Sequence, residues 1–328
     1  MDIHPSSLAG ADGGAPEVLR CLRQQVGAQA PCVLALVCEV DGSAYVAPGT
    51  LLLFGQAGRL RGWVSGGCLE RHIEERAAAL IAEEGVGEWI ELDQRDDAAL
   101  LAPSASGCRG RIRLRLLGPR DSARCAALAE LFLSAGLPMR VSVDAQGSLS
   151  LDCGDTAMHS ARLALPWPGP LPDPLLIRPA PRVLLLGAGA ESPLLIPQLR
   201  ALGWRVEACE QRPRWLPLAA GVDRLVEAPP ERGLALLEPR EEDAVLVMHH
   251  DFERDRAALA ALAGHPCRWI GLLGPRRRRD DLLRLLGEAS AALAPRLEAP
   301  VGLDLGGKGP AAIALSIAAS LQRWRHAD

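Results

Sequence analysis

The alternation of short apolar runs with amphipathic segments in the C-terminal half restricts the fold of this chain more than any other feature. From residue 183 onward, runs such as VLLLG, DAVLVM and CRWIGLLG are each followed by a segment whose apolar residues have helical spacing. Strands that alternate with helices in this way are typical of a parallel sheet covered by helices. We therefore expect a Rossmann-like parallel-sheet domain over residues 183–328.

A cluster of prolines precedes this half of the chain. Seven of the eighteen residues from Leu165 to Arg182 are proline, and proline is excluded from helix interiors and central strands. We interpret residues 165–182 as a linker between two domains.

The residues before the linker mix strand-like and helical patterns without regular alternation, so we expect a mixed α/β domain over residues 1–164. The patterns predict strands near 32–40, 50–54, 60–64, 87–92 and 111–117, and helices near 16–29, 69–84 and 121–135.

The composition excludes several classes of protein. The 328 residues carry a net charge of −4, which argues against a nucleic-acid-binding surface or an acidic-membrane surface. No apolar stretch approaches the roughly 20 residues of a membrane span, and the N-terminus lacks a secretion signal. Nine cysteines without a C-x-x-C pair indicate free thiols. We expect a cytoplasmic protein that binds neither nucleic acid nor membranes.

The stretch VLLLGAGAESP has the features of the first turn of a dinucleotide-binding fold. Gly187 and Gly189 would let the backbone approach a pyrophosphate, and Ser192 would cap the following helix. Glu210, after the second strand, could accept a hydrogen bond from a ribose hydroxyl. These residues predict a site for NAD(P) or another nucleotide, and a Rossmann-like scaffold that binds no nucleotide is an equal alternative.

In the N-terminal domain, the stretch GWVSGGCLERHIEE places a cysteine at the expected start of a helix. The strand would run to Val64, and Gly66 and Gly67 would form a tight turn before Cys68. A helix N-terminus favours the thiolate, which is a soft metal ligand, and the same amides could hold a phosphate. The alternative is a turn beneath which Cys68 is simply packed.

Two more glycine-containing loops belong to the same domain. Gly42 and Ser43 lie in VDGSAYVAPGT, and Cys108 lies in SGCRGRIRL. Loops of this composition commonly position donors near a ligand. We expect these two loops and the Cys68 turn to form one pocket.

Two further candidates follow strands of the C-terminal domain, at the sheet edge where α/β proteins bind ligands. His250 and Asp251 could form a polar site there, although Asp251 could instead cap the next helix. Gly274 and the arginines after it could receive a phosphate, or could form a solvated first helical turn.

Taken with their order along the chain, these motifs resemble the XdhC/CoxI family of molybdenum hydroxylase accessory proteins. The resemblance rests on GSAYVAPGT, SGGCLE, LLLGAGAES, LVMHHDFERD, WIGLLGPRRRR and APVGLDLGGKGPAAIALSIAA. It implies a protein that binds molybdenum cofactor (molybdopterin) and delivers it to a xanthine dehydrogenase-type apoenzyme. It also implies Cys68 as the metal ligand, and a cysteine desulfurase partner that sulfurates the cofactor. It leaves self-association into a homodimer open.

The chain departs from the family pattern at two places. It has Cys108-Arg109-Gly110 where the family commonly has Cys-Gly-Gly, and Gly309-Pro310-Ala311-Ala312 where a Thr-Pro-x-Glu run is usual.

We expect a non-enzymatic chaperone that works by binding and handover. One alternative is an NAD(P)-dependent oxidoreductase that uses Gly187, Gly189 and Glu210, with His250 as acid and base. Another is a sulfurtransferase that carries a persulfide on Cys68.

Overall fold

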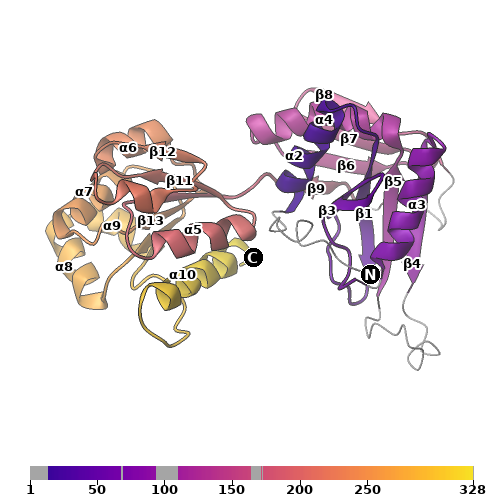
Figure 1. Cartoon of the computed structure of the whole chain (residues 1–328). Coiled ribbons are helices and arrows are strands. Elements are labelled where there is room, and N and C mark those ends of the chain that lie inside the picture. Colours follow the sequence, from indigo (N-terminus) through magenta and orange to yellow (C-terminus); the bar gives the residue numbers. More distant parts are fainter. Residues whose placement is uncertain (1–13, 68, 94–109, 164–170, 172, 328) are drawn as a thin grey trace. The chain divides into compact units, whose positions relative to one another are not determined.

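The structure, a computed structural model of the chain, describes residues 14–67, 69–93, 110–163, 171 and 173–327. It divides into two compact units, Met1–Ala180 and Pro181–Asp328, so the division falls within the proline-rich segment. Each unit has its own sheets and hydrophobic core (Figure 1). Within the described ranges, no helix is both long and apolar enough to cross a membrane.

The N-terminal unit is built on an antiparallel five-stranded sheet with the order β3-β2-β1-β5-β4. Its central strand, β1, is buried on both faces because Leu34 and Leu36 point to one hydrophobic cluster while Val33 and Ala35 point to another. The strands are β1 (Cys32–Asp41), β2 (Leu51–Gly55), β3 (Gly58–Arg61), β4 (Gly87–Asp93) and β5 (Arg111–Leu117).

Helices cover both faces of this sheet. On one face lie α2 (Gly14–Gly27) and α4 (Pro119–Ser134), and on the other lies α3 (Glu70–Ala82) (Figure 1). The prediction of a mixed α/β domain is confirmed, and each predicted helix is present within a few residues of its expected bounds.

A second antiparallel sheet, with the order β8-β7-β6-β9, packs into the same core as α2 and α4. Its strands are β6 (Met139–Val143), β7 (Leu149–Cys153), β8 (Thr156–His159) and β9 (Leu175–Ile177). The sequence patterns did not predict this sheet.

Two boundaries differ from the sequence prediction. Strand β9 lies inside the segment interpreted as a linker, where it pairs with β6 at the sheet edge. An edge position tolerates the flanking prolines because only one side of the strand needs backbone donors. The strand expected over 60–64 ends at Arg61, since Gly62 has φ +83° and passes close to the backbone of Leu51.

The C-terminal unit contains a fully parallel six-stranded sheet with the order β12-β11-β10-β13-β14-β15. The strands are β10 (Arg182–Leu186), β11 (Arg205–Cys209), β12 (Arg224–Val226), β13 (Ala244–Val247), β14 (Trp269–Leu272) and β15 (Leu297–Glu298). The Rossmann-like prediction is confirmed.

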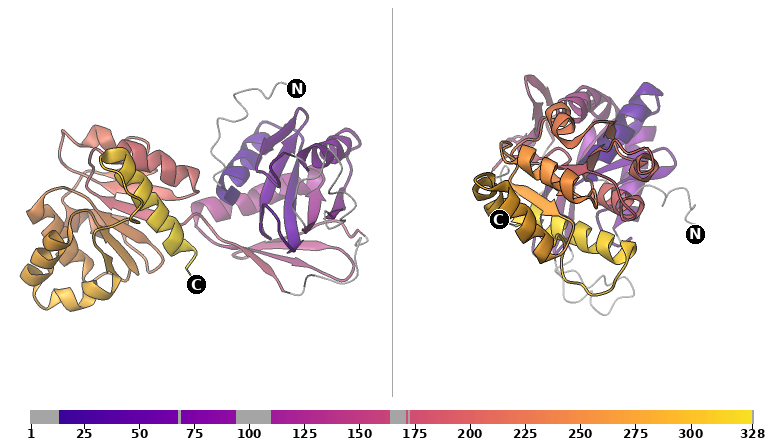
Figure 2. Two further views of the ribbon diagram at one scale, coloured as in Figure 1. Left: turned by 90° about the horizontal axis from the view of Figure 1, so that it is seen from below. Right: turned by 90° about the vertical axis from the view of Figure 1, so that its left-hand side faces the viewer.

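Helices pack on both faces of the parallel sheet. One face carries α5 (Ser192–Ala201) and α10 (Pro310–Arg325), which lie side by side in Figure 2. The other face carries α6 (Pro230–Leu237), α7 (Phe252–Leu262), α8 (Arg276–Leu286) and α9 (Ala289–Leu293).

The strand order reverses beside β10, because the chain passes from β10 to β11 and β12 and then returns to the opposite side with β13. In folds of this kind, ligands bind outside the carboxyl ends of the strands at this reversal. A ligand site is therefore expected at the segments that follow β10, β13, β14 and β15.

Candidate functional site

The turn before α3 is held from beneath by a buried carboxylate. Glu70 accepts hydrogen bonds from the backbone N–H groups of Val64 (3.1 Å) and Ser65 (2.8 Å) and from the Ser65 hydroxyl (2.5 Å). Burial alone would raise the pKa of Glu70, but these hydrogen bonds outweigh it and hold the pKa below its usual value. Glu70 is therefore an ionised anchor for the turn.

The Ser65 hydroxyl extends this anchor along the turn. Its oxygen accepts hydrogen bonds from the N–H groups of Gly67 and Leu69, both at 3.1 Å. The Gly67 amide is thus already used inside the turn, and the prediction that amides of this turn hold a phosphate stays a prediction. Sequence reasoning named neither Ser65 nor Glu70 as a functional residue, although a serine and a glutamate flanking Gly-Gly-Cys were visible in SGGCLE.

Above this anchor, Gly66 and Gly67 are exposed, and Gly67 has φ +115°. A side chain built on either glycine would meet no heavy atom of the described residues within 4 Å, so none of these residues fills the space beside the turn. Cys68, the predicted metal ligand, lies outside the described residues. Its role remains a prediction that rests on the sequence.

The second predicted loop lies against the start of β5. A Cβ atom on Gly110 would come within 2.3 Å of the carbonyl oxygen of Ser43, so only glycine allows this contact. Gly42, with φ +81°, makes the turn that brings Ser43 there. The Gly42–Ser43 loop and the chain that follows Cys108 are therefore neighbours, although Cys108 itself is outside the described part of the chain.

The Gly42–Ser43 loop and the Cys68 turn share one side of the five-stranded sheet. Ala44 and Val46 pack against the same hydrophobic cluster, between the sheet and α3, as Leu69. This placement is compatible with the predicted common pocket, which stays a prediction.

In the C-terminal unit, the two Rossmann glycines make room for side chains of the protein itself. Gly187 has φ +92°, and a Cβ atom there would lie 2.7 Å from the Cα atom of His249. A Cβ atom on Gly189 would lie 2.7 Å from Glu191 Oε2 and 2.8 Å from His250 Nε2. Gly187 is thus required by internal packing whether or not a nucleotide binds, whereas at Gly189 the Glu191 and His250 side chains occupy the space of a Cβ atom.

Ser192 does not cap α5, so that prediction is wrong. Ser192 is the first residue of the helix, and its buried hydroxyl oxygen accepts from the N–H group of Gly189 (3.0 Å), which closes the glycine loop. The cap residue is Glu191, whose carboxylate lies beside Gly189 and 3.0 Å from His250 Nε2. An internal carboxylate therefore stands near the helix start where a pyrophosphate was expected.

Glu210, the predicted ribose acceptor, is occupied by donors of the protein itself, and its role toward a ribose stays a prediction. Its carboxylate accepts from the N–H groups of Ala188, Gln211 and Arg212 and twice from the Arg212 guanidinium, at 2.6–2.9 Å. Burial opposes ionisation, but the hydrogen bonds from Arg212 outweigh it and lower the pKa of Glu210 to about 2. Five donors fill the lone pairs of this carboxylate.

Arg212, which sequence reasoning did not single out, ties three strand ends together. Besides Glu210 after β11, its guanidinium donates to the carbonyl oxygens of Ala188 after β10 (3.1 Å) and His249 after β13 (2.7 Å). The crevice at the strand reversal is therefore crossed by a side chain of the protein. The only sequence signal was an arginine two residues after Glu210.

The residues after β13 have divided roles. His249 is buried, with Nδ1 3.1 Å from Asp255 Oδ1. His250 adopts a left-handed conformation with φ +55°, and 43% of its side chain is exposed. Asp251 accepts from the N–H group of Arg254 (3.0 Å) and caps α7, which confirms the capping interpretation.

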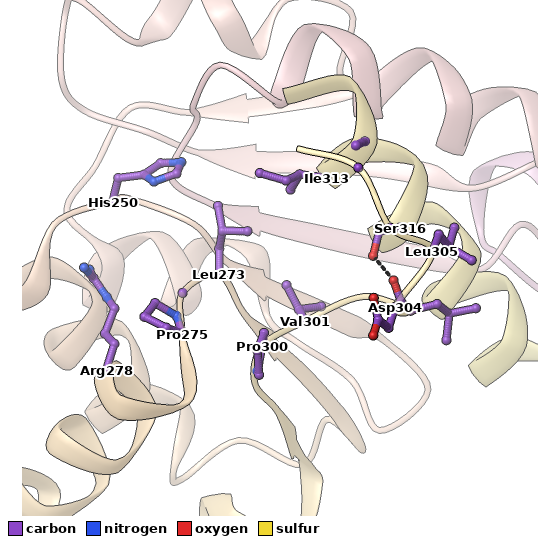
Figure 3. Close-up of a pocket in the computed structure, with 15 residues that line it drawn as sticks. His250, Leu273, Pro275, Arg278, Pro300, Val301, Asp304, Leu305, Ile313 and Ser316 are labelled. Carbon is purple, nitrogen blue, oxygen red and sulfur yellow. Dashed lines mark hydrogen bonds between the residues drawn. The ribbon is translucent and has the colours of Figure 1, made fainter. Parts of the chain in front are cut away.

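A cavity of about 490 Å³ lies beyond the carboxyl ends of β13, β14 and β15 (Figure 3). His250 and Gly274, two of the predicted site residues, both line it. Leu273, Val301 and Ile313 provide apolar walls, and Arg278 and Asp304 provide charges. Gly187, Gly189, Ser192 and Glu210 are not among its lining residues.

A metal centre is not evident in the part of the chain that the structure describes, where no three His, Cys, Asp or Glu residues are grouped for an ion. The predicted ligand Cys68 lies outside that part of the chain.

Comparison with known families decides which proteins this chain is related to. The model of the XdhC Rossmann domain matches residues 183–321, and the model of the XdhC and CoxI family matches residues 26–90. The chain belongs to the XdhC/CoxI family. The two matches cover both structural units, as the resemblance of the motifs predicted.

Relatives and solved structures extend this result along the chain. A Bacillus subtilis protein that is named as a probable subunit of xanthine dehydrogenase is 28% identical over 316 residues, which cover 90% of this chain and 94% of that protein. A Bacillus halodurans protein whose crystal structure is described as a xanthine dehydrogenase is 25% identical, with a TM-score of 0.78, over 93% of this chain and 94% of that one. An uncharacterized Escherichia coli protein, YqeB, is 31% identical over 43% of this chain and 27% of its own length.

Proposed function

We propose that this chain is an accessory protein for a xanthine dehydrogenase-type molybdenum hydroxylase. The support is its membership of the XdhC/CoxI family together with a relative, similar over nearly its whole length, that is named as a probable xanthine dehydrogenase component.

In this proposal the chain binds molybdenum cofactor as cargo and hands it to the client apoenzyme. The observation that carries this step is the turn before α3, where buried Ser65 and Glu70 hold exposed Gly66 and Gly67 beside space that no described residue fills. The next residue in the sequence is Cys68, whose thiolate would be a soft ligand for molybdenum or its terminal sulfur. A rigid turn with solvent access suits a cargo that must enter and leave.

Binding and handover fit the C-terminal unit better than hydride transfer does. The oxidoreductase alternative needs Glu210 for a ribose, and Arg212 and three backbone N–H groups already occupy that carboxylate. The persulfide-carrier alternative is separated by mass spectrometry. Reaction with a cysteine desulfurase in the absence of cofactor should leave Cys68 without an added sulfur atom, since here the desulfurase acts on the bound cofactor.

The proposal includes a cysteine desulfurase as the partner that sulfurates the cargo and places both proteins in the cytoplasm. A homodimer is a further part of the proposal that sedimentation analysis can test.

The test compares Cys68→Ser with Cys209→Ser in protein produced where molybdenum cofactor is made. Cys209 is buried, and its sulfur lies 3.1 Å from the carbonyl oxygen of Ala228, so a serine there keeps a partner and serves as the control. Molybdenum content and activation of the client apoenzyme are measured at matched folding. Loss of the soft ligand should lower both at least about tenfold in Cys68→Ser alone. Wild-type values in Cys68→Ser would refute the assignment.

A further inference from the structure

We infer that the cavity beyond β13, β14 and β15 binds a phosphate monoester of a planar, amino-substituted heterocycle, and that the Gly187–Ser192 loop does not. This inference assigns a ligand site to the C-terminal unit, in addition to the Cys68 turn of the proposed function. If the heterocycle is a pterin, the inference rests on the proposed function; if it is a nucleotide base, it does not.

Several backbone N–H groups of the Gly187–Ser192 loop already donate hydrogen bonds within the protein and are not free for a phosphate. The N–H group of Gly187 donates to the carbonyl oxygen of Cys209 (2.9 Å), and those of Ala188 and Gly189 donate to Glu210 and Ser192 side chains. The Glu191 carboxylate beside Gly189 would also repel an anion. Three amides of the usual anion site of a Rossmann domain are thus used by the protein's own groups.

The neighbouring cavity has the size and walls of a ligand site. Its volume of about 490 Å³ lies within the range of roughly 300–1,000 Å³ that small-molecule pockets span. Leu273 and Val301, which follow β14 and β15, form apolar walls together with Ile313 of α10 (Figure 3). Walls of this kind suit a flat ring, which loses little solvation when it is covered.

Arg278 supplies the cation at one end of the cavity. Its guanidinium is positioned by Asp255 (2.5 Å from Nη2) and by the ring of Phe252 (5.8 Å to the centroid). Its Nε atom is buried and has no hydrogen-bond partner among the described residues, although buried donors are normally paired. A phosphate oxygen at this end would meet a fixed positive charge.

Two helices start at the cavity and add to its positive character. Pro275, the cap residue of α8, and Ala312, in the first turn of α10, both line it. First-turn N–H groups lack partners within their own helix, and the positive dipole end favours an anion. The cavity thus combines Arg278 with two positive helix ends.

Asp304 lies on the opposite side of the cavity from Arg278 (Figure 3). A carboxylate there would accept hydrogen bonds from adjacent ring N–H and amino groups, such as the edge that guanine and pterins share. Arg278 at one end and Asp304 at the other therefore favour a ligand that carries its phosphate far from the amino-substituted edge of its ring.

The test uses calorimetry on the purified full-length chain with four probes: GMP, AMP, guanosine and a 6-substituted pterin phosphate. At least one of GMP and the pterin phosphate should bind, and which one binds identifies the source of the ligand. GMP binding should be at least about tenfold tighter than AMP or guanosine if the nucleotide is the ligand, because AMP lacks the donor edge and guanosine lacks the charge. If neither GMP nor the pterin phosphate binds, the inference is wrong.

A matched pair of variants places the ligand. Ala312→Glu puts a carboxylate inside the cavity, whereas Ala311→Glu puts the same charge on the same helical turn at a residue that does not line it. A carboxylate near a helix N-terminus interacts favourably with the helix dipole, so both variants should fold. Ala312→Glu should weaken binding of the active probe at least about tenfold, and Ala311→Glu should weaken it much less. Equal affinities in the two variants would overturn the inference. The Cys68→Ser test of the proposed function does not depend on this result.

Discussion

The hydrogen-bond geometry beneath the Cys68 turn predicts that Glu70→Gln destabilises the turn although the two side chains have nearly the same shape. The Ser65 hydroxyl oxygen already accepts two hydrogen bonds, from the N–H groups of Gly67 and Leu69, so its proton must be donated to Glu70 Oε2. A glutamine NH2 group at that place would face an oxygen with both lone pairs in use. The glutamine would have to leave a buried donor unpaired or break one of the turn's own bonds.

The expected cost follows from that one conflict. An unsatisfied buried polar group costs about 1–3 kcal/mol. If the turn opens locally, this corresponds to amide hydrogen exchange that is roughly 5- to 150-fold faster at Ser65, Gly67 and Leu69. The control is Glu75→Gln, an exposed change on the same helix that should alter exchange by less than about threefold.

The measurement is hydrogen exchange with mass spectrometry on peptides that contain the turn. Lowering the pH should also reduce the protection of the turn's amides against exchange, as the substitution does. Because folding lowers the pKa of Glu70, its contribution is fully present above the unfolded value near 4.5 and is lost as the pH falls through the lower folded pKa. Protection that is the same in Glu70→Gln and Glu75→Gln would refute the role given to Glu70.

Two further predictions concern packing. Gly187→Ala should destabilise the C-terminal unit by at least about 2 kcal/mol in thermal unfolding, because its Cβ atom would lie 2.7 Å from His249 and its φ is +92°; wild-type stability would show that the loop can move away. Cys32→Ser should cost about 1–3 kcal/mol because the site is buried in an apolar cluster, whereas Cys209→Ser should cost less than about 1 kcal/mol because the Ala228 carbonyl can accept its hydroxyl. The reverse order of these two variants in urea unfolding would contradict that comparison.

The sequence by itself determined the parts of this protein that depend on local periodicity. Runs of valine, leucine and isoleucine alternating with amphipathic segments are sufficient to predict a parallel sheet covered by helices, because a strand buried on both faces must be apolar throughout. The motifs and their order were also sufficient to place the chain in its family. The small second sheet escaped prediction because its strands are short, and one of them lies among prolines.

Only the tertiary structure decided which of the candidate residues are available to a ligand. Gly187, Gly189, Ser192 and Glu210 have the spacing of a nucleotide site, but whether their polar atoms are free depends on side chains that arrive from other strands. Glu210, after β11, accepts from the Ala188 N–H group after β10, and Arg212 donates to the carbonyl oxygens of Ala188 after β10 and His249 after β13. The cavity likewise joins segments that are distant in sequence, from His250 to Ser316. Spacing along a chain specifies backbone conformation, whereas the partners of a donor or acceptor are fixed only when the chain is folded.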